Sequence, residues 1–309
     1  LVAASAISTP PLSAWKLGLR SAHMHIEIGL PSHIAHVRGR LTVEWARRAE
    51  HRGFAGLAAI DRLVYPSLDA MTALAVAAGA TTGIGLTFNV LLAPLYPAVL
   101  LAKQVITLAE ASGGRLRLGL GVGSRCDDYT AVGVDYRRRG RILDETAALL
   151  RAACEAEVVT GDQPLCPAPV RIPILFGGRA DATIRRAVTV GDGWTAGALR
   201  DYANQSVFAE RVRAAWAARG RSGRPWLQAS VNFAFGDDEA VAAGRRHLQS
   251  YYGFKPDYAA LNVADMLTTP QEAAQTVRAY ADLGFDRLVF HPCVPDTGQV
   301  DRLANAVLG

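Results

Sequence analysis

The chain has 309 residues, of which half are apolar and 20% are charged, a composition typical of a globular protein and not of a disordered or fibrous one. Its net charge of +5 is mild and no basic stripe runs along it, so we expect no nucleic-acid partner. No apolar run reaches the roughly 20 residues that a membrane-spanning helix requires, so we expect no membrane partner either.

Residues 1–23 differ from the rest of the chain. They are small, apolar and irregular, and Lys16 and Arg20 follow the apolar stretch, whereas a secretory signal carries its positive charges before it. Met24 directly precedes the first clear strand. We therefore expect Met24 to be the native start, residues 1–23 to be an appended arm of cloning or other origin, and residues 24–309 to form one domain.

The cysteine and histidine patterns indicate neither disulfides nor a metal site. The four cysteines are irregularly spaced and form no Cys-x-x-Cys pair, as expected for reduced thiols in the cytoplasm. They are Cys126, Cys154, Cys166 and Cys293. The triplet His23-Met24-His25 resembles a His-x-His metal pair, but it precedes the first strand, and the fifth and sixth strands hold no histidine that could complete the site.

From Met24 onward, apolar strand patterns alternate with helical patterns. Pro97 and Gly113 bracket one helix in the usual order, and Thr269 and Glu272 form a capping box that opens another. Strands are expected at residues 25–29, 54–60, 84–92, 115–121, 173–177, 193–196, 227–235 and 287–290. Helices are expected at residues 42–52, 69–80, 97–113, 141–155, 182–190, 201–219, 237–251, after 269, and at 297–308.

Eight strands that are each followed by a helix predict an α/β fold, a (β/α)8 TIM barrel with loop insertions in a single domain. Strands such as 174–176 are continuously apolar, as parallel strands buried on both faces are. The additional length falls at residues 124–139, 157–171 and 252–268. A doubly wound Rossmann sheet is the structural alternative, but the glycines of 119–123 lack the Gly-x-Gly-x-x-Gly spacing of a dinucleotide-binding turn.

In such a barrel the functional site lies at the carboxyl ends of the strands. Those ends carry glycines and small polar side chains with few acid–base pairs, which suits a flat anionic cofactor better than hydrolysis. In chain order they are His33 and His36; Asp61 and Arg62; Thr87, Phe88, Asn89 and Val90; Gly121, Gly123 and Ser124; Gly177 and Gly178; Thr195, Gly197 and Arg200; Asn232; and His291. Aromatic side chains in the neighbouring loops predict a partly aromatic substrate pocket, with contributions from Tyr65, Tyr129, Tyr251, Tyr252 and Phe254.

Three segments together resemble the bacterial luciferase-like family. They are residues 113–145, with the glycines of 119–123 and the arginines of 137–141; residues 173–178, Pro-Ile-Leu-Phe-Gly-Gly; and residues 185–194, which end Val-Gly-Asp-Gly-Trp. Their order and spacing match the family, and the similarity extends from Met24 to the end of the chain. The family contains flavin-dependent monooxygenases and oxidoreductases that use the deazaflavin F420.

The resemblance implies a cofactor ring at the strand ends and residues that contact it. It implies a non-prolyl cis peptide bulge within 87–90, which we place at Thr87–Phe88, and an acidic contact to the polar edge of the ring at Asp61. The implied cofactor-binding residues are Asp61, Thr87, Phe88, Asn89, Val90, Gly121, Gly123, Arg141, Gly177, Gly178, Thr183 and Arg200. Among them, Gly177, Gly178 and Thr183 match the phosphate loop, Arg141 a phosphate contact of the luciferase branch and Arg200 one of the deazaflavin branch. A homodimer is also implied.

The chain departs from the deazaflavin-dependent sugar-phosphate dehydrogenases of this family. It has Arg62 and Ser124 where those enzymes have a histidine and a glutamate, so their substrate and proton-transfer scheme are not carried over. The remaining candidates for a catalytic acid or base are Asp127, Tyr129, His33 and His291.

The expected function is hydride transfer between F420 and a small organic substrate. One alternative is an FMNH2-dependent monooxygenase that uses dioxygen, because FMN and F420 rings occupy the same kind of pocket. A non-catalytic flavin-binding barrel is the alternative from another class.

Overall fold

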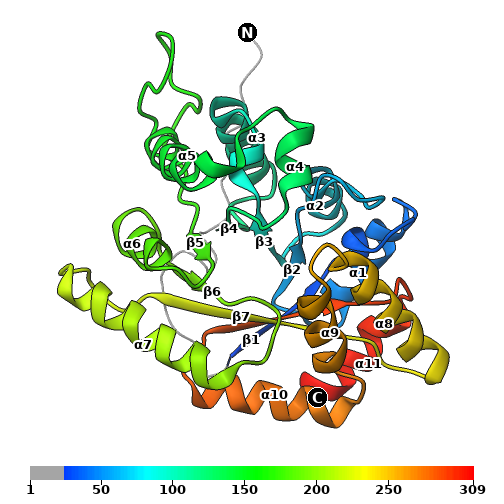
Figure 1. Cartoon of the computed structure of the whole chain (residues 1–309). Coiled ribbons are helices and arrows are strands. Elements are labelled where there is room, and N and C mark those ends of the chain that lie inside the picture. Colours follow the sequence, from blue (N-terminus) through cyan, green and yellow to red (C-terminus); the bar gives the residue numbers. More distant parts are fainter. Residues whose placement is uncertain (1–23) are drawn as a thin grey trace, which may run out of the picture.

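The computed structural model describes residues 24–309, and the expectation for residues 1–23 lies outside the described residues. Eight parallel strands close into a barrel in chain order, β1 to β8 (Figure 1). The predicted TIM barrel is therefore confirmed, and the open Rossmann sheet is excluded. The strands are β1 His25–Gly29, β2 Gly56–Ala59, β3 Gly85–Leu91, β4 Leu116–Leu120, β5 Ile174–Gly177, β6 Gly193–Thr195, β7 Trp226–Phe233 and β8 Arg287–Pro292.

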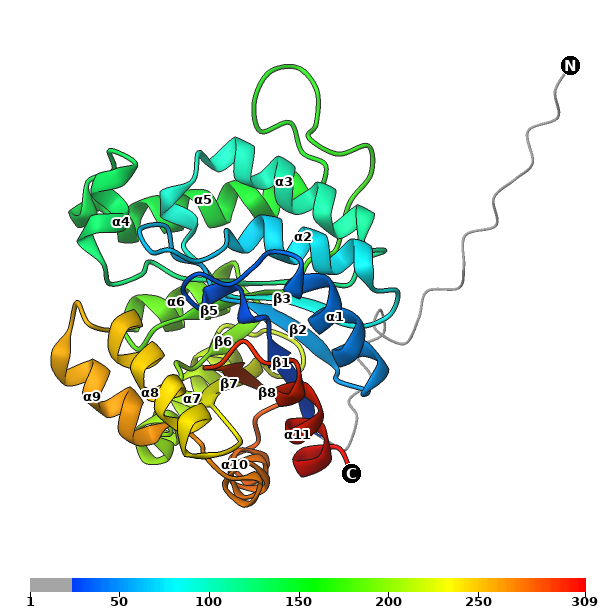
Figure 2. The same cartoon turned by 90° about the vertical axis from the view of Figure 1, so that its right-hand side faces the viewer.

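The helices surround the strands in both views (Figures 1 and 2). They are α1 Leu41–His51, α2 Ala70–Ala80, α3 Ala98–Ala111, α4 Cys126–Ala131, α5 Arg139–Cys154, α6 Asp181–Thr189, α7 Tyr202–Ala218, α8 Asp238–Tyr251, α9 Pro256–Asp265, α10 Pro270–Asp282 and α11 Gly298–Val307. The predicted capping box at Thr269 and Glu272 opens α10, whereas Pro97 caps α3 instead of being its first helical residue. None of these helices combines the length and the apolar character needed to cross a membrane.

The strands are buried on both faces because helices cover their outer side and side chains fill the barrel. β1 pairs with β8, with Ile26 opposite Leu288 and Ile28 opposite Phe290, and this pairing closes the ring. Such continuous burial is what parallel strands require, and it explains why their sequences are apolar without alternation.

Two of the three predicted insertions contain a helix that the sequence did not predict. The short helix α4 lies within 124–139, and α9 lies within 252–268, where it packs against α8. The third insertion, 157–171, has no helix or strand and projects from the body of the molecule after α5 (Figures 1 and 2).

The irregularity in β3 comes later than expected. Thr87 and Phe88 keep a regular register, opposite Arg117 and Leu118 of β4, and the register shifts only beyond Phe88. The cis peptide bond joins Asn89 to Val90. The range 87–90 was therefore right, but the placement at Thr87–Phe88 was wrong. These two residues still pair regularly with β4, with Phe88 in the apolar core and Thr87 in a buried charge cluster.

The buried charge cluster consists of Glu27, Thr87, Arg117 and Arg287, which come from β1, β3, β4 and β8. Glu27 is fully buried and accepts hydrogen bonds from Arg117, from Arg287 at 2.8 Å and from Thr87 at 3.1 Å. Burial alone would raise the pKa of Glu27, but the two guanidinium groups outweigh it and hold that pKa below its usual value. The cluster thus joins four strands inside the barrel through one ionised carboxylate.

Candidate functional site

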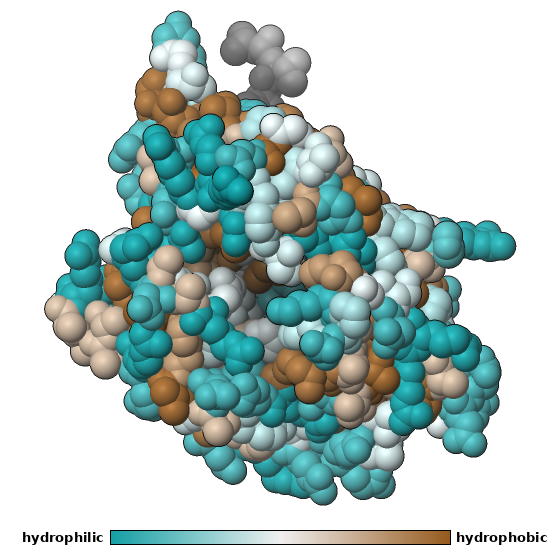
Figure 3. All heavy atoms as spheres, in the orientation of Figure 1, coloured by the Kyte–Doolittle hydropathy of each residue, from teal (hydrophilic) through white to brown (hydrophobic). Residues whose placement is uncertain are grey.

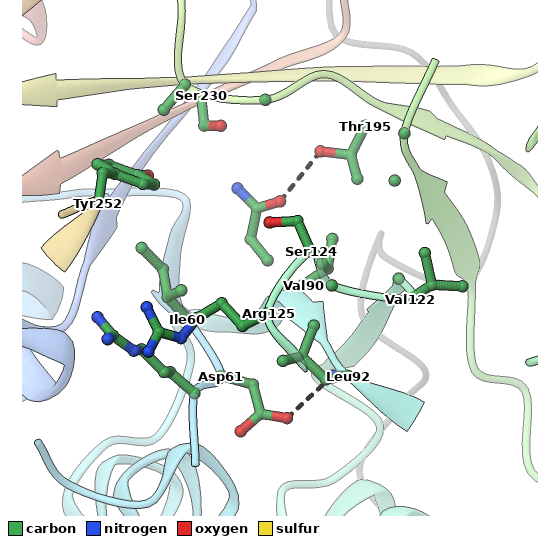
Figure 4. A pocket seen from close by; sticks show the side chains of 18 of the residues that line it. Ile60, Asp61, Val90, Leu92, Val122, Ser124, Arg125, Thr195, Ser230 and Tyr252 are labelled. Atoms are coloured by element: carbon green, nitrogen blue, oxygen red, sulfur yellow. Dashed lines mark hydrogen bonds between the residues drawn. The ribbon is translucent and has the colours of Figure 1, made fainter. Parts of the chain in front are cut away.

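A cavity of about 390 Å³ opens at the carboxyl ends of the strands. The face of the molecule drawn in Figure 3 is hollowed near its centre, and Figure 4 shows cavity-lining residues from close by. The lining comes from the ends of β2 to β8 and from residues 251–258, which comprise the end of α8, the link to α9 and the start of α9. Eight of the predicted catalytic and cofactor-binding residues line this cavity: Asp61, Asn89, Val90, Gly121, Gly123, Gly177, Gly178 and His291. Four other residues predicted at the strand ends also line it: Arg62, Ser124, Thr195 and Gly197.

Val90 forms the floor of the cavity, and the neighbouring strands make room for it. A Cβ atom on Gly121 would lie 2.7 Å from Val90 Cγ2, and one on Gly119 or Gly177 would lie 3.1 Å from Val90 Cγ1. The sequence suggested that these glycines expose bare backbone to a ligand. At Gly121 the space that a side chain would need is instead filled by Val90, so this glycine serves the packing of the floor as well as lining the cavity.

Asp61 stands on the cavity wall with both carboxylate oxygens engaged. Its Oδ2 accepts a hydrogen bond from the backbone N–H of Leu92 at 2.9 Å (Figure 4), and the hydroxyl of Tyr96 lies 3.1 and 3.2 Å from the two oxygens. Burial raises the pKa of Asp61 to about 6 despite these donors. The carboxyl group can therefore gain and lose a proton near neutral pH, as a general acid or base must.

A chain of hydrogen bonds connects β7, β6, β3 and β8 beneath the cavity. Gln228 donates to the hydroxyl of Thr195, which donates to Asn89 Oδ1 at 3.0 Å. The amide of Asn89 is then left to donate to His291 Nε2, at 3.2 Å. Burial, aided by nearby His33, holds the pKa of His291 well below its usual value. A neutral imidazole that accepts at Nε2 carries its proton on Nδ1, so His291 positions Asn89 and has no proton on the nitrogen that faces it.

Three of the four predicted acid–base candidates do not line the cavity. Asp127 pairs with Arg125 at the surface. Tyr129 is buried and donates its hydroxyl to the carbonyl of Val122. His33 is buried behind His291, with ring centroids 5.8 Å apart, and its Nδ1 lies 3.1 Å from the carbonyl of Leu30.

Five predicted cofactor contacts also lie away from the cavity lining. Thr87 is buried in the charge cluster around Glu27, and Phe88 is buried in the apolar core. Arg141 is exposed and pairs with Glu145 on α5, and Arg200 pairs with Asp265 at the end of α9. Thr183, on α6, lies beside the cavity, because its hydroxyl would be 3.0 Å from a Cβ atom on Gly178. Their proposed contacts to a cofactor stay predictions.

Other cavity residues were not predicted from the sequence. Ser230, not Asn232, provides the lining from β7, whereas Asn232 donates to Asn262 of α9. Two residues apart on a strand, they share a face, so the strand pattern could have identified either. The remaining unpredicted residues, from strand ends and loops, include Ile60, Leu92, Arg125, Asp128 and Tyr258. The predicted aromatic lining is confirmed for Tyr251, Tyr252 and Phe254, but not for Tyr65 and Tyr129.

Solved structures share this fold. The monooxygenase RslO1 from Streptomyces bottropensis superposes with a TM-score of 0.78 at 18% identity, over 92% of this chain and 99% of that one. An F420-dependent secondary alcohol dehydrogenase, solved with an F420-acetone adduct, also gives a TM-score of 0.78, at 17% identity over 93% of this chain and 98% of its own. At these identities the likeness concerns the fold.

The sequence comparisons identify the family. The uncharacterized protein Rv0940c of Mycobacterium tuberculosis is 35% identical over 146 residues, which are 43% of this chain and 49% of that protein, so the match spans about half of the relative's length. Residues 24–267 match the sequence model of the luciferase-like monooxygenases. This match covers most of the barrel and includes strands β1 to β7 with their cavity-lining ends. The chain therefore belongs to the luciferase-like monooxygenase family.

Proposed function

We propose that this chain is an oxidoreductase that binds a reduced flavin-type cofactor in the cavity at the strand ends, with F420 favoured, and acts on a small organic substrate. The observation that carries the proposal is the cavity itself, with its apolar floor at Val90 and a titratable carboxyl group at Asp61 on its wall. When bound, the cofactor ring would donate or accept a hydride.

The residues present fit such a cofactor. A volume of about 390 Å³ is in the range of pockets that bind small molecules and cofactors. Val90, Gly121 and Gly177 provide a floor without protruding polar groups, against which a flat ring can lie. Gly178 has a φ of +114° and adjoins Thr183 near the start of α6, and a helix N-terminus of this kind favours a phosphate group.

Asp61 supports hydride transfer in preference to a purely cofactor-binding role. When an alcohol is oxidised or a carbonyl reduced by a hydride, a proton must also leave or reach the oxygen atom. Asp61, with a pKa of about 6, is placed on the cavity wall to hold that proton. His291 would keep the amide of Asn89 in one orientation, and the aromatic residues of 251–258 would exclude water from the substrate.

A second candidate function is an FMNH2-dependent monooxygenase. It is favoured by the equal TM-score of RslO1, which is a monooxygenase. Both functions place a ring over the same floor, so the choice depends on which cofactor binds and whether oxygen is consumed.

The test is to titrate the purified full chain with F420 and with FMN, and to measure oxygen uptake with each reduced cofactor. F420 binding without oxygen uptake, together with hydride transfer to a member of an alcohol and ketone panel, is the expected result. Oxygen uptake with FMNH2 would establish the second candidate. Failure to bind either cofactor, or binding without turnover on any substrate, would contradict the proposed function.

A matched pair of variants locates the cofactor. Gly197 lines the cavity, and a Cβ atom there would meet no protein atom within 4 Å. Gly197→Leu should therefore fill the cavity and abolish cofactor binding without destabilising the barrel. Gly39 also has no atom within 4 Å of a Cβ position and lies outside the cavity, so Gly39→Leu should bind normally.

A further inference from the structure

Arg62, which follows β2, carries a positive charge that is largely buried. It is only 9% exposed and lines the cavity. Its guanidinium forms no ion pair with any carboxylate of residues 24–309, and its Nε is buried without a hydrogen-bond acceptor. Burial of a charge without a partner is unfavourable, and an anionic ligand bound in the cavity would offset that cost.

Two tyrosine rings hold Arg62 in one orientation. The guanidinium carbon lies 3.9 Å from the centre of the Tyr65 ring and 4.6 Å from that of Tyr251, and these two rings are nearly perpendicular, with centroids 5.3 Å apart. Its Nη1 donates to the backbone carbonyl of Tyr251 at 2.7 Å. The two ring contacts and this hydrogen bond restrict the orientation of the guanidinium, a planar group whose N–H edge suits a carboxylate.

Arg125 adds a second positive charge to the same wall. It lines the cavity, stacks on Phe254 at 4.5 Å and lies close enough to Arg62 to lower its pKa, after burial itself. Two carboxylates lie nearby. Asp128 accepts from the backbone N–H of Val64, and its other oxygen lies 3.8 Å from Arg125 Nε, while Asp127 pairs with Arg125. The charge of Asp128 partly offsets the lowering of the Arg62 pKa, but neither carboxylate forms an ion pair with Arg62.

The wall beside these arginines is apolar and aromatic. Tyr252, Phe254 and Tyr258 line the cavity next to Tyr251. A ligand that places an anionic group against Arg62 would therefore lay an apolar or aromatic body against these rings.

We propose that the substrate of this enzyme carries a carboxylate, which Arg62 binds with support from Arg125, and an apolar or aromatic body that packs against Tyr252, Phe254 and Tyr258. The proposal rests on the proposed function for the redox step and names the substrate class of the same cavity. A cofactor phosphate is the other possible anion. However, the loop at 177–178, which we propose for the cofactor phosphate, follows β5, three strands around the barrel from β2. The wall near Arg62 would then be left to the substrate.

The test compares benzoate with benzamide, which have the same shape and differ in charge. Each is titrated calorimetrically into the full chain, with and without bound F420. Since hydrogen bonds to a charged partner contribute about 1.5–3 kcal/mol, wild-type protein should bind benzoate at least about tenfold more tightly than benzamide. Arg62→Gln should reduce this preference to less than about twofold, and Arg62→Lys should restore only part of it.

Controls separate local from general effects. Arg246→Gln removes an exposed arginine of α8 that pairs with Glu239, and its preference for benzoate should equal that of the wild type. Arg125→Gln should reduce the preference less than Arg62→Gln does. Each variant's melting temperature is measured, and a variant that does not fold is replaced by Arg62→Met, which keeps the length of the apolar stem.

The outcomes distinguish the two proposals. Equal affinity for benzoate and benzamide, no benzoate binding at millimolar concentration, or a preference that survives Arg62→Gln would overturn the substrate class. So would a loss of FMN affinity in Arg62→Gln with riboflavin affinity unchanged, because Arg62 would then bind the cofactor phosphate. Benzoate preference in a protein that binds neither F420 nor FMN would instead overturn the proposed function and leave the anion site standing.

Discussion

Asp61 illustrates how one side chain is set for proton exchange by its surroundings. Its raised pKa comes first from burial, which disfavours the ionised form, and the hydrogen bonds from Leu92 and Tyr96 only partly offset this. Because the folded-state pKa of about 6 lies above the ordinary 3.8, the folded protein binds this proton more tightly than the unfolded chain does. The protonated Asp61 therefore adds to the free energy of unfolding below pH 4, and this contribution is lost as the pH rises through 6.

Replacement of Asp61 should therefore change the pH dependence of unfolding. Between pH 4 and pH 7.5 the wild type should lose up to about 3 kcal/mol of unfolding free energy relative to Asp61→Asn, whose side chain does not titrate. Urea unfolding at several pH values measures this difference. Asp181→Asn, at an exposed position on α6, should follow the wild type, and parallel curves for Asp61→Asn would show that Asp61 ionises as freely as an exposed aspartate.

Residues at strand ends were predictable from the sequence, and residues on loops were not. Asp61, Asn89, Val90 and His291 were identified because parallel strands of a barrel bring their carboxyl ends to one mouth. Arg141 and other loop or helix candidates were assigned by resemblance alone, and the direction of their side chains depends on tertiary packing that a single sequence does not encode. The sequence also could not show that Arg62 forms no ion pair with a described carboxylate, because this depends on which side chains surround it in the fold.

At the scale of elements, β3, β4 and β5 are coupled through Val90. Its side chain occupies the space left by glycines of β4, the neighbouring strand, and of β5, the strand after it. Glycine at Gly121 is therefore required by a contact across the sheet and not by its own backbone conformation. The three strands therefore form the cavity floor as one unit.

A double-mutant cycle should detect this coupling. Gly121→Ala should destabilise the protein by about 1–3 kcal/mol, because the new methyl group overlaps Val90. In the Val90→Ala background, Gly121→Ala should lower the free energy of unfolding by less. The coupling energy between the two substitutions should be about 0.5–2 kcal/mol, as measured by chemical denaturation. Gly39→Ala, with open space around its Cβ position, is the matched control. Additive effects of the two changes would contradict the contact.

The predictability of the elements varied with their apolar content. All eight strands were found in order, with ends within two residues, since each is a short apolar segment bounded by turns. Helix α4 is only six residues long and polar, so it has no usable periodicity. Helix α9 begins at Pro256, and proline is common at the first position of a helix. The sequence therefore contained an indication of α9, which was missed because residues 252–268 were treated as a loop.

At the scale of the whole molecule, the barrel is closed by apolar packing and by the charge cluster around Glu27. This carboxylate receives hydrogen bonds from β3, β4 and β8 while it belongs to β1, so it connects strands on both sides of the ring closure. Two buried guanidinium groups depend on it, and burial lowers the pKa of Arg117 to about 10, with Arg287 adding to the effect.

Glu27→Gln should destabilise the whole barrel. Removing one partner of a buried ion pair leaves uncompensated charge, which typically costs about 3–5 kcal/mol. Chemical denaturation measures the loss, and near-ultraviolet circular dichroism confirms that the variant still folds. Glu145→Gln breaks the exposed pair with Arg141 on α5 and should change stability by less than about 1 kcal/mol. If Glu27→Gln lowers the free energy of unfolding by no more than this control does, the charge cluster does not stabilise the barrel.

The closed barrel and the family were both predicted from the whole sequence, but the cofactor was not resolved. The order of apolar strands specifies the ring, and the segments of 113–145, 173–178 and 185–194 specify the family. The apolar floor at Val90 would contact the ring of F420 and the ring of FMN in the same way. Neither the strand pattern nor the cavity shape therefore indicates which cofactor binds.

The mouth of the barrel divides into two parts that mutation can alter separately. Val90 and its glycines are in contact across adjacent strands, whereas the aromatic wall comes from residues 251–258, which comprise the end of α8, the link to α9 and the first turn of α9. Exchange of this short segment between homologous barrels would change the substrate specificity and leave the strands of the barrel unchanged. A new substrate specificity can thus arise from changes in one peripheral segment.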